Sequence, residues 1–165
     1  RRWTHVLSLD GGPHQQRQHP QQAEQQQPRR LRVNLLDLPS ENILQHLTRC
    51  VGFVSRALSH RGPGDEGEGA PAPSVLVHCH AGQSRSAAVV AAYLMKSEGL
   101  SFGDALTSLR KAKPDAEPNA GFRDQLQLYE RMGCRIDVNS PEYRHHLLKH
   151  QTRQTFRGCL QRGEA

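Results

Sequence analysis

The residues from Val75 to Val90 combine a cysteine, an arginine and a loop of small residues at a spacing that suits chemistry on an anion. A β-branched run reaches Cys79, a short loop follows, and an apolar helix is predicted to open near Arg85. The backbone N–H groups of a loop wrapped at a helix N-terminus form an anion cradle, and the helix dipole adds positive potential there. A cysteine at the base of such a cradle is expected to be largely a thiolate.

Arg85 adds the second component of this arrangement, because five residues separate it from Cys79. An arginine in the first helical turn can return over the cradle and bind two oxygens of a phosphate group. A nucleophile, a cradle and a bidentate clamp then surround one tetrahedral anion, which predicts cleavage of a phosphate ester through a phosphocysteine. The alternative is an inert buried cysteine beside an ordinary surface arginine. The predicted strand, loop and helix favour the anion site.

Such a cleavage also needs an acid that protonates the departing oxygen. Asp37 is the candidate, because it follows a predicted strand and precedes a loop and a helix start. A capping or loop carboxylate is the alternative interpretation of this residue. Asp10 also follows a strand, but it lies beside a glutamine-rich segment that offers no fixed position. Asp104 and Asp124 fall within helical patterns and are better explained by capping and by a solvated face.

Length and charge limit the classes of protein to consider. The chain has 165 residues, which suits one domain with a real core. Its 22 Lys and Arg residues against 16 Asp and Glu residues give a net charge of +6, which favours encounter with acidic, phosphorylated substrates. Nucleic acid is the competing partner, but aromatic residues are only 5% and do not alternate with the basic ones. A generic solvated surface is the simpler interpretation of the excess charge.

The cysteine pattern bears on metal sites and on the cellular compartment. None of the four cysteines forms a Cys-x-x-Cys pair, so neither a zinc site nor a disulfide framework is predicted. A catalytic thiol needs a reducing compartment, which predicts the cytoplasm and the nucleus. The longest non-polar run, Ala87 to Met95, is too short to span a bilayer, and no membrane partner is expected. The missing initial Met indicates a fragment.

The chain begins with strands and continues with helices. Strands are predicted over residues 4–10, 31–36 and 75–78, and the second leads into a helix with Ser40 as its N-cap. That helix has one broad apolar face, formed by Ile43, Leu44, Leu47, Cys50, Val51, Val54 and Leu58. The helix from about Ser86 to Gly99 is apolar nearly all round and should be central. Two further helices are predicted, capped by Ser101 and Asn119.

These elements predict an α/β fold in which helices pack on a central sheet, with the cysteine loop between a strand and the central helix. Residues 1–140 are expected to form one catalytic domain, and residues 141–165 a basic tail that is partly helical. Within the domain, the glutamine-rich segment at about 13–29 is predicted to be disordered. The Gly- and Pro-rich segment at about 59–73 is predicted to be a flexible loop.

The segment from His78 to Ser86 resembles the signature loop of the dual-specificity protein phosphatases, within the cysteine-dependent tyrosine phosphatases. Leu36-Asp37, with Asn42-Ile43 following, resembles the general-acid loop of that family. Pro118-Asn119-Ala120-Gly121-Phe122 resembles its Pro-Asn-x-Gly-Phe segment. Within this family, the sequence of these segments is most similar to that of the branch with a C-terminal zinc-binding domain. Compared with that branch, the chain is expected to lack the N-terminal strands and the zinc-binding domain.

The resemblance implies a role for each matching residue. Cys79 would attack phosphorus, Arg85 would bind the phosphoryl group, and Asp37 would protonate the leaving group and then act as a base. Ser86 would stabilise the departing thiolate, while His78 would orient the loop and Asn119 would brace it from outside. The substrate-binding residues implied by the match are His80, Ala81, Gly82, Gln83, Ser84 and Arg85. No cofactor or metal is needed, since the cradle and the arginine neutralise the phosphoryl charge.

The implied substrates are proteins that carry phosphotyrosine or phosphoserine and phosphothreonine. An inositide substrate is less expected, because the loop interior from His80 to Ser84 lacks the extra basic residues that such enzymes favour. A second hypothesis stays open, namely a phosphate-binding or scaffolding module with little turnover. The basic tail motivates it, and the branch implies association with ribosomal particles or RNA.

Overall fold

The computed structural model describes residues 3–11, 28–59 and 72–160, with side chains described up to residue 151. Three strands, β1 (His5–Asp10), β2 (Arg29–Asn34) and β3 (Val75–His78), form a parallel sheet in the order β2-β1-β3. In its register, Leu7 of β1 pairs with Leu31 on one side and with Val77 on the other. The parallel arrangement brings the carboxyl ends of all three strands to one edge of the sheet. The loops that carry Asp37 and Cys79 begin at this edge.

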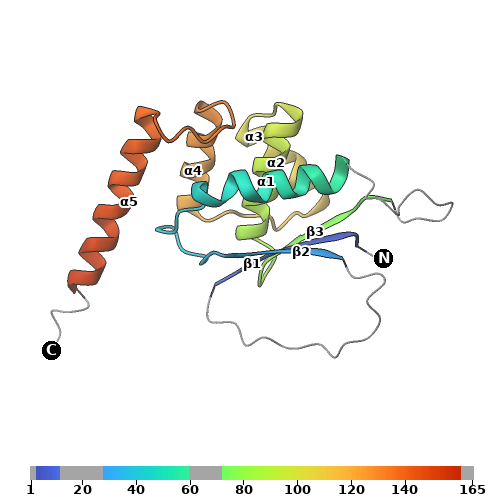
Figure 1. Cartoon of the computed structure of the whole chain (residues 1–165), viewed down its shortest axis with the longest axis horizontal. Helices are drawn as coiled ribbons and strands as arrows, with labels where there is room; N and C mark the ends of the chain where they lie inside the picture. Colours follow the sequence, from blue (N-terminus) through green and yellow to red (C-terminus); the bar gives the residue numbers. More distant parts are fainter. Residues whose placement is uncertain (1–2, 12–27, 60–71, 161–165) are drawn as a thin grey trace.

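Four helices, α1 (Leu44–Ser59), α2 (Arg85–Glu98), α3 (Phe102–Ala112) and α4 (Ala120–Arg131), lie on one face of the sheet (Figure 1). A fifth helix, α5 (Pro141–Leu160), stands beside α4 and covers much of the segment predicted as a basic tail. Helix α2 contacts α1, α3, α4 and β3, so its predicted central place is confirmed. The fold class is the predicted α/β arrangement of helices packed on a sheet.

Alternation along the strands places the core between the sheet and the helices. The odd-numbered strand residues Leu7, Leu9, Leu31 and Val33 are buried in the same apolar cluster as residues of the four packed helices. Cys50 belongs to this cluster and is fully buried, as its place on the apolar face predicted. The buried face of α1 differs from the predicted apolar face at one position. Ala57 is buried there, whereas Leu58 is 40% exposed.

The helix termini follow the predicted capping residues at α2, α3 and α4. Ser101 accepts a hydrogen bond from the N–H of Asp104 at 3.1 Å, and Asn119 accepts one from the N–H of Phe122 at 3.0 Å. Gly99, in a left-handed conformation, follows the last residue of α2. The side chains of Ser101 and Asn119 each satisfy a backbone N–H group that has no partner within the helix.

Two predicted boundaries are wrong. Strand β2 lies at 29–34 rather than 31–36, because pairing with β1 sets its limits: the N–H of Arg29 donates to Thr4 O, and the ladder ends where Asp10 pairs with Asn34. Arg29, placed in the glutamine-rich segment by the sequence, is therefore a strand residue. Helix α1 begins at Leu44, four residues after the predicted cap Ser40. The rest of the two predicted loops at 13–29 and 59–73 lies mostly outside the described residues.

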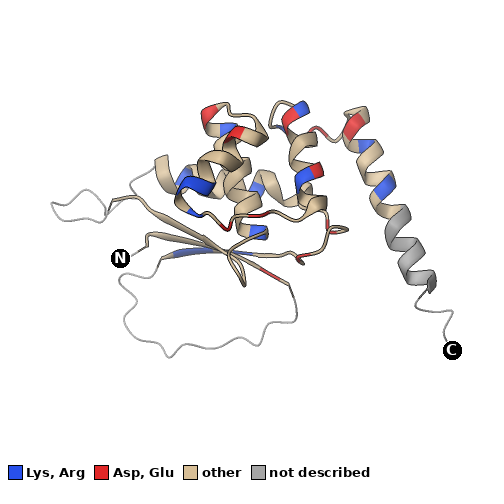
Figure 2. Ribbon diagram, turned by 180° about the vertical axis from the view of Figure 1, so that it is seen from behind, with Lys and Arg blue, Asp and Glu red and all other residues tan. Residues whose placement is uncertain are grey.

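Positive charge is distributed over the molecule. Lys and Arg residues lie on β2 and on every helix (Figure 2). In the described ranges, none of the helices combines the length and the apolar character that a membrane crossing requires.

Candidate active site

Cys79 lies at the carboxyl end of β3, where the chain enters a loop that leads into α2. Its side chain is 8% exposed, and its Sγ atom lies 3.3 Å from Ser86 Oγ in the first turn of the helix. Gly82 turns the loop with a φ of +71°, a left-handed conformation that residues with a Cβ rarely adopt. The predicted strand, loop and helix therefore surround the cysteine as the spacing indicated.

The environment of Cys79 favours the thiolate. Burial acts to raise the pKa of this thiol, but hydrogen bonds from the Ser86 hydroxyl and from the backbone N–H groups of Ser86 and Gly82 act in the opposite direction. The positive charge of Arg85 adds to them, and the net result is a pKa below the ordinary value of a cysteine. Since the thiolate is the nucleophilic form, this loop prepares Cys79 to attack an electrophile.

Arg85 is buried at the start of α2 and connects the cysteine loop with the segment at 35–43, which we call the acid loop. One guanidinium nitrogen of Arg85 donates to Leu35 O at 3.2 Å, and its Nε lies 3.8 Å from Asp37 Oδ2. Within the described part of the chain, Nε makes no hydrogen bond. A guanidinium held in this way has donors left to bind phosphoryl oxygens.

Asp37 lies in the acid loop and is held by two neighbours. Its Oδ1 atom accepts hydrogen bonds from Ser84 Oγ at 2.6 Å and from Asn119 Nδ2 at 2.9 Å. The N–H of Asn119 in turn donates to Ser84 Oγ at 3.1 Å. The structure thus brings together the candidate acid, the arginine and the residue expected to brace the loop. Ser84, matched to the substrate-binding residues, directs its hydroxyl to the acid.

The other residues of the signature loop lie at its periphery. His80, Ala81 and Gln83 are exposed. The side chain of Gln83 donates to Asp115 Oδ2 at 3.3 Å, and its carbonyl accepts from the N–H of Glu117, so the segment before α4 supports the loop. His78 was expected to orient the loop. Its Nε2 lies 2.8 Å from Ser8 Oγ, and this hydrogen bond ties the end of β3 to the central strand β1.

Gln125 was not among the predicted site residues. It lies on α4 between Phe122 and Tyr129 and is only 4% exposed. Its Oε1 atom accepts from the N–H groups of Ile43, at 2.9 Å, and Leu44, at 3.4 Å, at the start of α1. This amide caps the helix in place of the predicted Ser40. The signal in the sequence is a polar residue at a buried position of a helical pattern.

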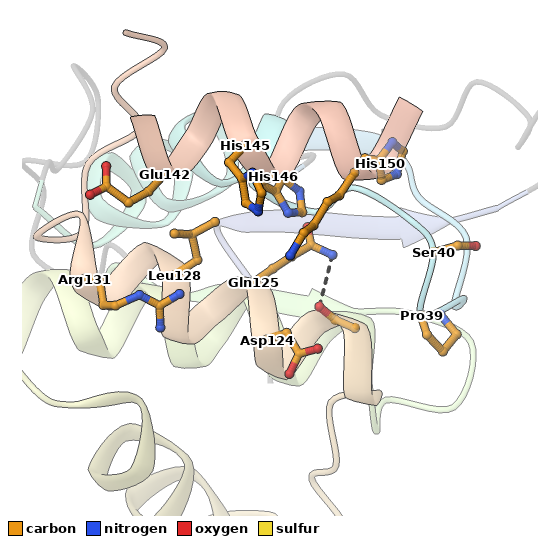
Figure 3. Close-up of a pocket in the computed structure, with 12 residues that line it drawn as sticks. Pro39, Ser40, Asp124, Gln125, Leu128, Arg131, Glu142, His145, His146 and His150 are labelled. Atoms are coloured by element: carbon orange, nitrogen blue, oxygen red, sulfur yellow. Dashed lines mark hydrogen bonds between the residues drawn. The ribbon is translucent and has the colours of Figure 1, made fainter. Parts of the chain in front are cut away.

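A cavity of about 340 Å³ lies between the acid loop, α4 and α5 (Figure 3). It is lined by Pro39, Ser40, Gly121, Asp124, Gln125, Leu128, Arg131, Glu142, His145, His146, Lys149 and His150. None of these residues belongs to the cysteine loop, so the cavity is distinct from the site around Cys79. It borders the acid loop on the side of α5.

The geometry around Cys79 agrees with a comparison of the whole sequence. The profile of the family described as "Dual specificity phosphatase, catalytic domain" matches residues 5–132. The chain belongs to this family. The match includes both the acid loop and the cysteine loop, and it ends at the last turn of α4.

Curated members of the dual specificity phosphatases are similar over most of the chain. Dual specificity protein phosphatase MPK-4 of Drosophila melanogaster is 40% identical over 146 residues, which are 88% of this chain and 34% of that protein. Dual specificity protein phosphatase 12 of Mus musculus is 43% identical over 149 residues, which are 90% of this chain and 40% of that protein. The chain therefore spans well under half the length of these relatives.

Solved structures of dual specificity phosphatases share the fold. The Yvh1 phosphatase domain from Chaetomium thermophilum has a TM-score of 0.65 and 31% identity, with 82% of this chain and 83% of that domain covered. The human tyrosine phosphatase-like serine/threonine/tyrosine-interacting protein has a TM-score of 0.62 and 31% identity, with coverage of 79% and 78%.

Proposed function

We propose that this chain is a protein phosphatase that hydrolyses phosphotyrosine and phosphoserine or phosphothreonine through a phosphocysteine. The observation that carries the proposal is the environment of Cys79: its Sγ lies 3.3 Å from Ser86 Oγ, at the start of α2, and its pKa is lowered. Arg85 and Asp37 meet at the same edge of the sheet. Membership in the dual specificity phosphatase family supports the same reaction.

In the first step, the Cys79 thiolate attacks phosphorus, so that a P–S bond forms while the P–O bond to the substrate side chain breaks. Asp37 gives a proton to the departing oxygen, which leaves as a neutral hydroxyl group. The negative charge on the phosphoryl oxygens is met by the loop N–H groups and by the guanidinium of Arg85. These donors are fixed by the fold before the substrate binds.

In the second step, water attacks the phosphocysteine and Asp37 accepts its proton. The P–S bond breaks, inorganic phosphate leaves, and Cys79 returns to its thiolate form. The hydroxyl of Ser86 donates a hydrogen bond to this sulfur as negative charge develops on it, which makes the thiolate a better leaving group. The substrates proposed are phosphorylated proteins of the cytoplasm and nucleus, compartments where Cys79 stays reduced.

A second candidate is a phosphate-binding module with little turnover, which associates with ribosomal particles or RNA. The observation in its favour is α5, whose residues Arg144 and Lys149 are exposed beside the phosphatase fold. One similar solved structure is that of a tyrosine phosphatase-like serine/threonine/tyrosine-interacting protein, and its name supports a role in interaction for this chain too.

Turnover of an aryl phosphate and of phosphotyrosine and phosphoserine peptides distinguishes the two candidates. For the phosphatase, Cys79→Ser should lower kcat/KM by more than about a thousandfold, because the nucleophile is lost. Asp37→Asn should lower it by about a hundredfold or more on the phosphoserine peptide, since its leaving group most needs a proton. Full activity in Cys79→Ser, or phosphate binding without turnover in the unaltered chain, would contradict the proposal.

A further inference from the structure

We infer that Gln125 is a positioning residue for Asp37, because it fastens the far end of the acid loop to α4. The inference rests on the proposed function, in which Asp37 acts as the general acid. Gln125 lies outside the signature loop and has no described contact with Cys79, Arg85 or Asp37. Its influence would act through the backbone of the acid loop.

The side-chain amide of Gln125 binds four backbone groups at once. Its oxygen accepts from the N–H groups of Ile43 and Leu44, and its nitrogen donates to Glu41 O at 2.8 Å and to Gly121 O at 3.1 Å (Figure 3 shows the last of these). The two N–H groups require an acceptor and the two carbonyls require a donor, so only an amide in this orientation satisfies all four. We call these four hydrogen bonds the Gln125 clasp.

A close backbone approach reinforces the Gln125 clasp one turn earlier on α4. A Cβ atom at Gly121 would lie 1.9 Å from Pro39 O and 2.6 Å from Pro39 Cα, well inside contact distance. The absence of a side chain at Gly121 is therefore what allows the acid loop to rest directly on the first turn of α4. Pro39 is only two residues from Asp37.

The two ends of the acid loop are thus held by different parts of the site. Arg85 holds its beginning through Leu35 O, and the Gln125 clasp holds its end at residues 41–44. Asn119, on the same segment as Gly121 and Gln125, then meets the carboxylate of Asp37 between these anchors. Helix α4 is the common support, so the clasp fixes the distance between the backbone of Asp37 and its partner Asn119.

The cavity beside the acid loop shows where the loop can go when the clasp is lost. Pro39 and Ser40 line this cavity of about 340 Å³ (Figure 3), whose lining includes no residue of the cysteine loop. Movement into the cavity would change the position of Asp37 relative to Arg85 and Asn119, the two residues that its carboxylate now faces. Misplacement of a reacting group by about 1 Å can cost a large factor in rate, so a small shift would suffice.

Substrates with different leaving groups distinguish a loss of acid positioning from a general loss of fold stability. An activated aryl phosphate releases an acidic phenol that needs little protonation, whereas phenyl phosphate releases a basic phenolate that needs the acid. Loss of acid positioning should therefore affect phenyl phosphate much more than the activated ester. Loss of folded protein would affect both substrates equally. The ratio kcat/KM reports formation of the phosphocysteine, the step in which the acid donates its proton.

The experiment compares Gln125→Met, which keeps side-chain length but removes the amide, with Gln127→Met on the exposed side of the same helix. For Gln125→Met, kcat/KM should fall about tenfold or more on phenyl phosphate and less than about threefold on the activated ester. Inhibition by inorganic phosphate should be unchanged. Gln127→Met should match the unaltered chain on both substrates. Gly121→Ala, which removes no polar group, should give the same unequal loss by pushing Pro39 away.

An Asp37→Asn background completes the test. There the Gln125→Met effect on phenyl phosphate should disappear, because no acid remains to be positioned. Equal losses on both substrates, or an undiminished loss in the Asp37→Asn background, would overturn the role of Gln125. The result for Gly121→Ala decides the matter if Gln125→Met does not fold. The proposed function is tested separately, by asking whether the unaltered chain turns over substrate and whether this turnover depends on Cys79. A failure of the proposed function can therefore be distinguished from a failure of the role inferred for Gln125.

Discussion

Cys79 and Cys50 are both buried free thiols, yet the structure prepares them for opposite behaviour. Cys50 is fully buried on α1, and burial raises its pKa to about 12 despite the nearby charge of Arg49. Cys79 is 8% exposed at the end of β3, and its pKa is lowered. Burial acts to raise the pKa of both thiols, so burial alone does not decide the chemistry of these two residues. The difference lies in the hydrogen-bond donors around each sulfur.

The backbone explains which cysteine has donors. Cys50 lies in the middle of α1, where each N–H group is already bound within the helix. Cys79 faces the first turn of α2, where N–H groups have no partner within the helix and can point at an anion. The same helix start that would bind a phosphoryl group also stabilises the thiolate. The start of α2 therefore both activates the Cys79 nucleophile and provides the binding site for the phosphoryl group that it attacks.

The largest effect expected from this comparison is in alkylation by iodoacetamide. At pH 7, Cys79 should react at least about a thousandfold faster than Cys50, because only thiolates react and a thiol with a pKa of about 12 is almost wholly protonated. As pH falls from 8 to 7, Cys79 should also lose less of its rate than an ordinary thiol, because its pKa is lowered. Mass spectrometry of the two peptides over time measures both rates. Similar alkylation rates for the two cysteines would contradict the difference in pKa between Cys79 and Cys50.

A smaller effect is expected from Cys50→Ala, which tests the structural side of the contrast. The variant should keep full turnover but lose about 1–2 kcal/mol of unfolding free energy, because a buried side chain leaves a gap in the core. Denaturant unfolding measures this loss. A marked fall in kcat, with Cys79 still reactive, would show that Cys50 has a role beyond packing.

The pH dependence of that loss has a definite sign. The folded-state pKa of Cys50 is raised, so its contribution is complete below the unfolded pKa of about 8.5 and declines as pH rises toward about 12. The stability difference between the unaltered chain and Cys50→Ala should therefore shrink above about pH 8.5. A difference that grows in this range would contradict the raised pKa.

The sequence predicted the parts of the site that a short segment determines. The cysteine loop, the start of α2 and the cap at Asn119 depend on residues within a few positions of one another, and each was found as expected. The candidate acid Asp37 was also identified from its place after a strand. These inferences needed only local geometry, namely a strand end, a small-residue turn and a helix start.

The contacts between distant segments were not predictable in this way. Ser40 satisfies the local preference for an N-cap, but the helix begins at Leu44 because Gln125, about 80 residues away, binds its first N–H groups. The hydrogen bond from the Ser84 hydroxyl to Asp37 joins residues 47 positions apart, so the local sequence could not reveal it. Strand β2 likewise begins at Arg29 because of its register with β1. Each departure arises where tertiary contact outweighs local propensity.

The central claim, a phosphoryl group carried on Cys79, is tested most directly by trapping that group. In Ser86→Ala the thiolate is a poorer leaving group, so phosphocysteine should accumulate during turnover of an aryl phosphate while its hydrolysis slows by about tenfold or more. Rapid acid quenching followed by mass spectrometry should find one phosphoryl group on the peptide with Cys79 and none on the peptide with Cys50. Phosphate on another residue, or turnover that continues with no phosphorylated Cys79 at any time, would contradict the account.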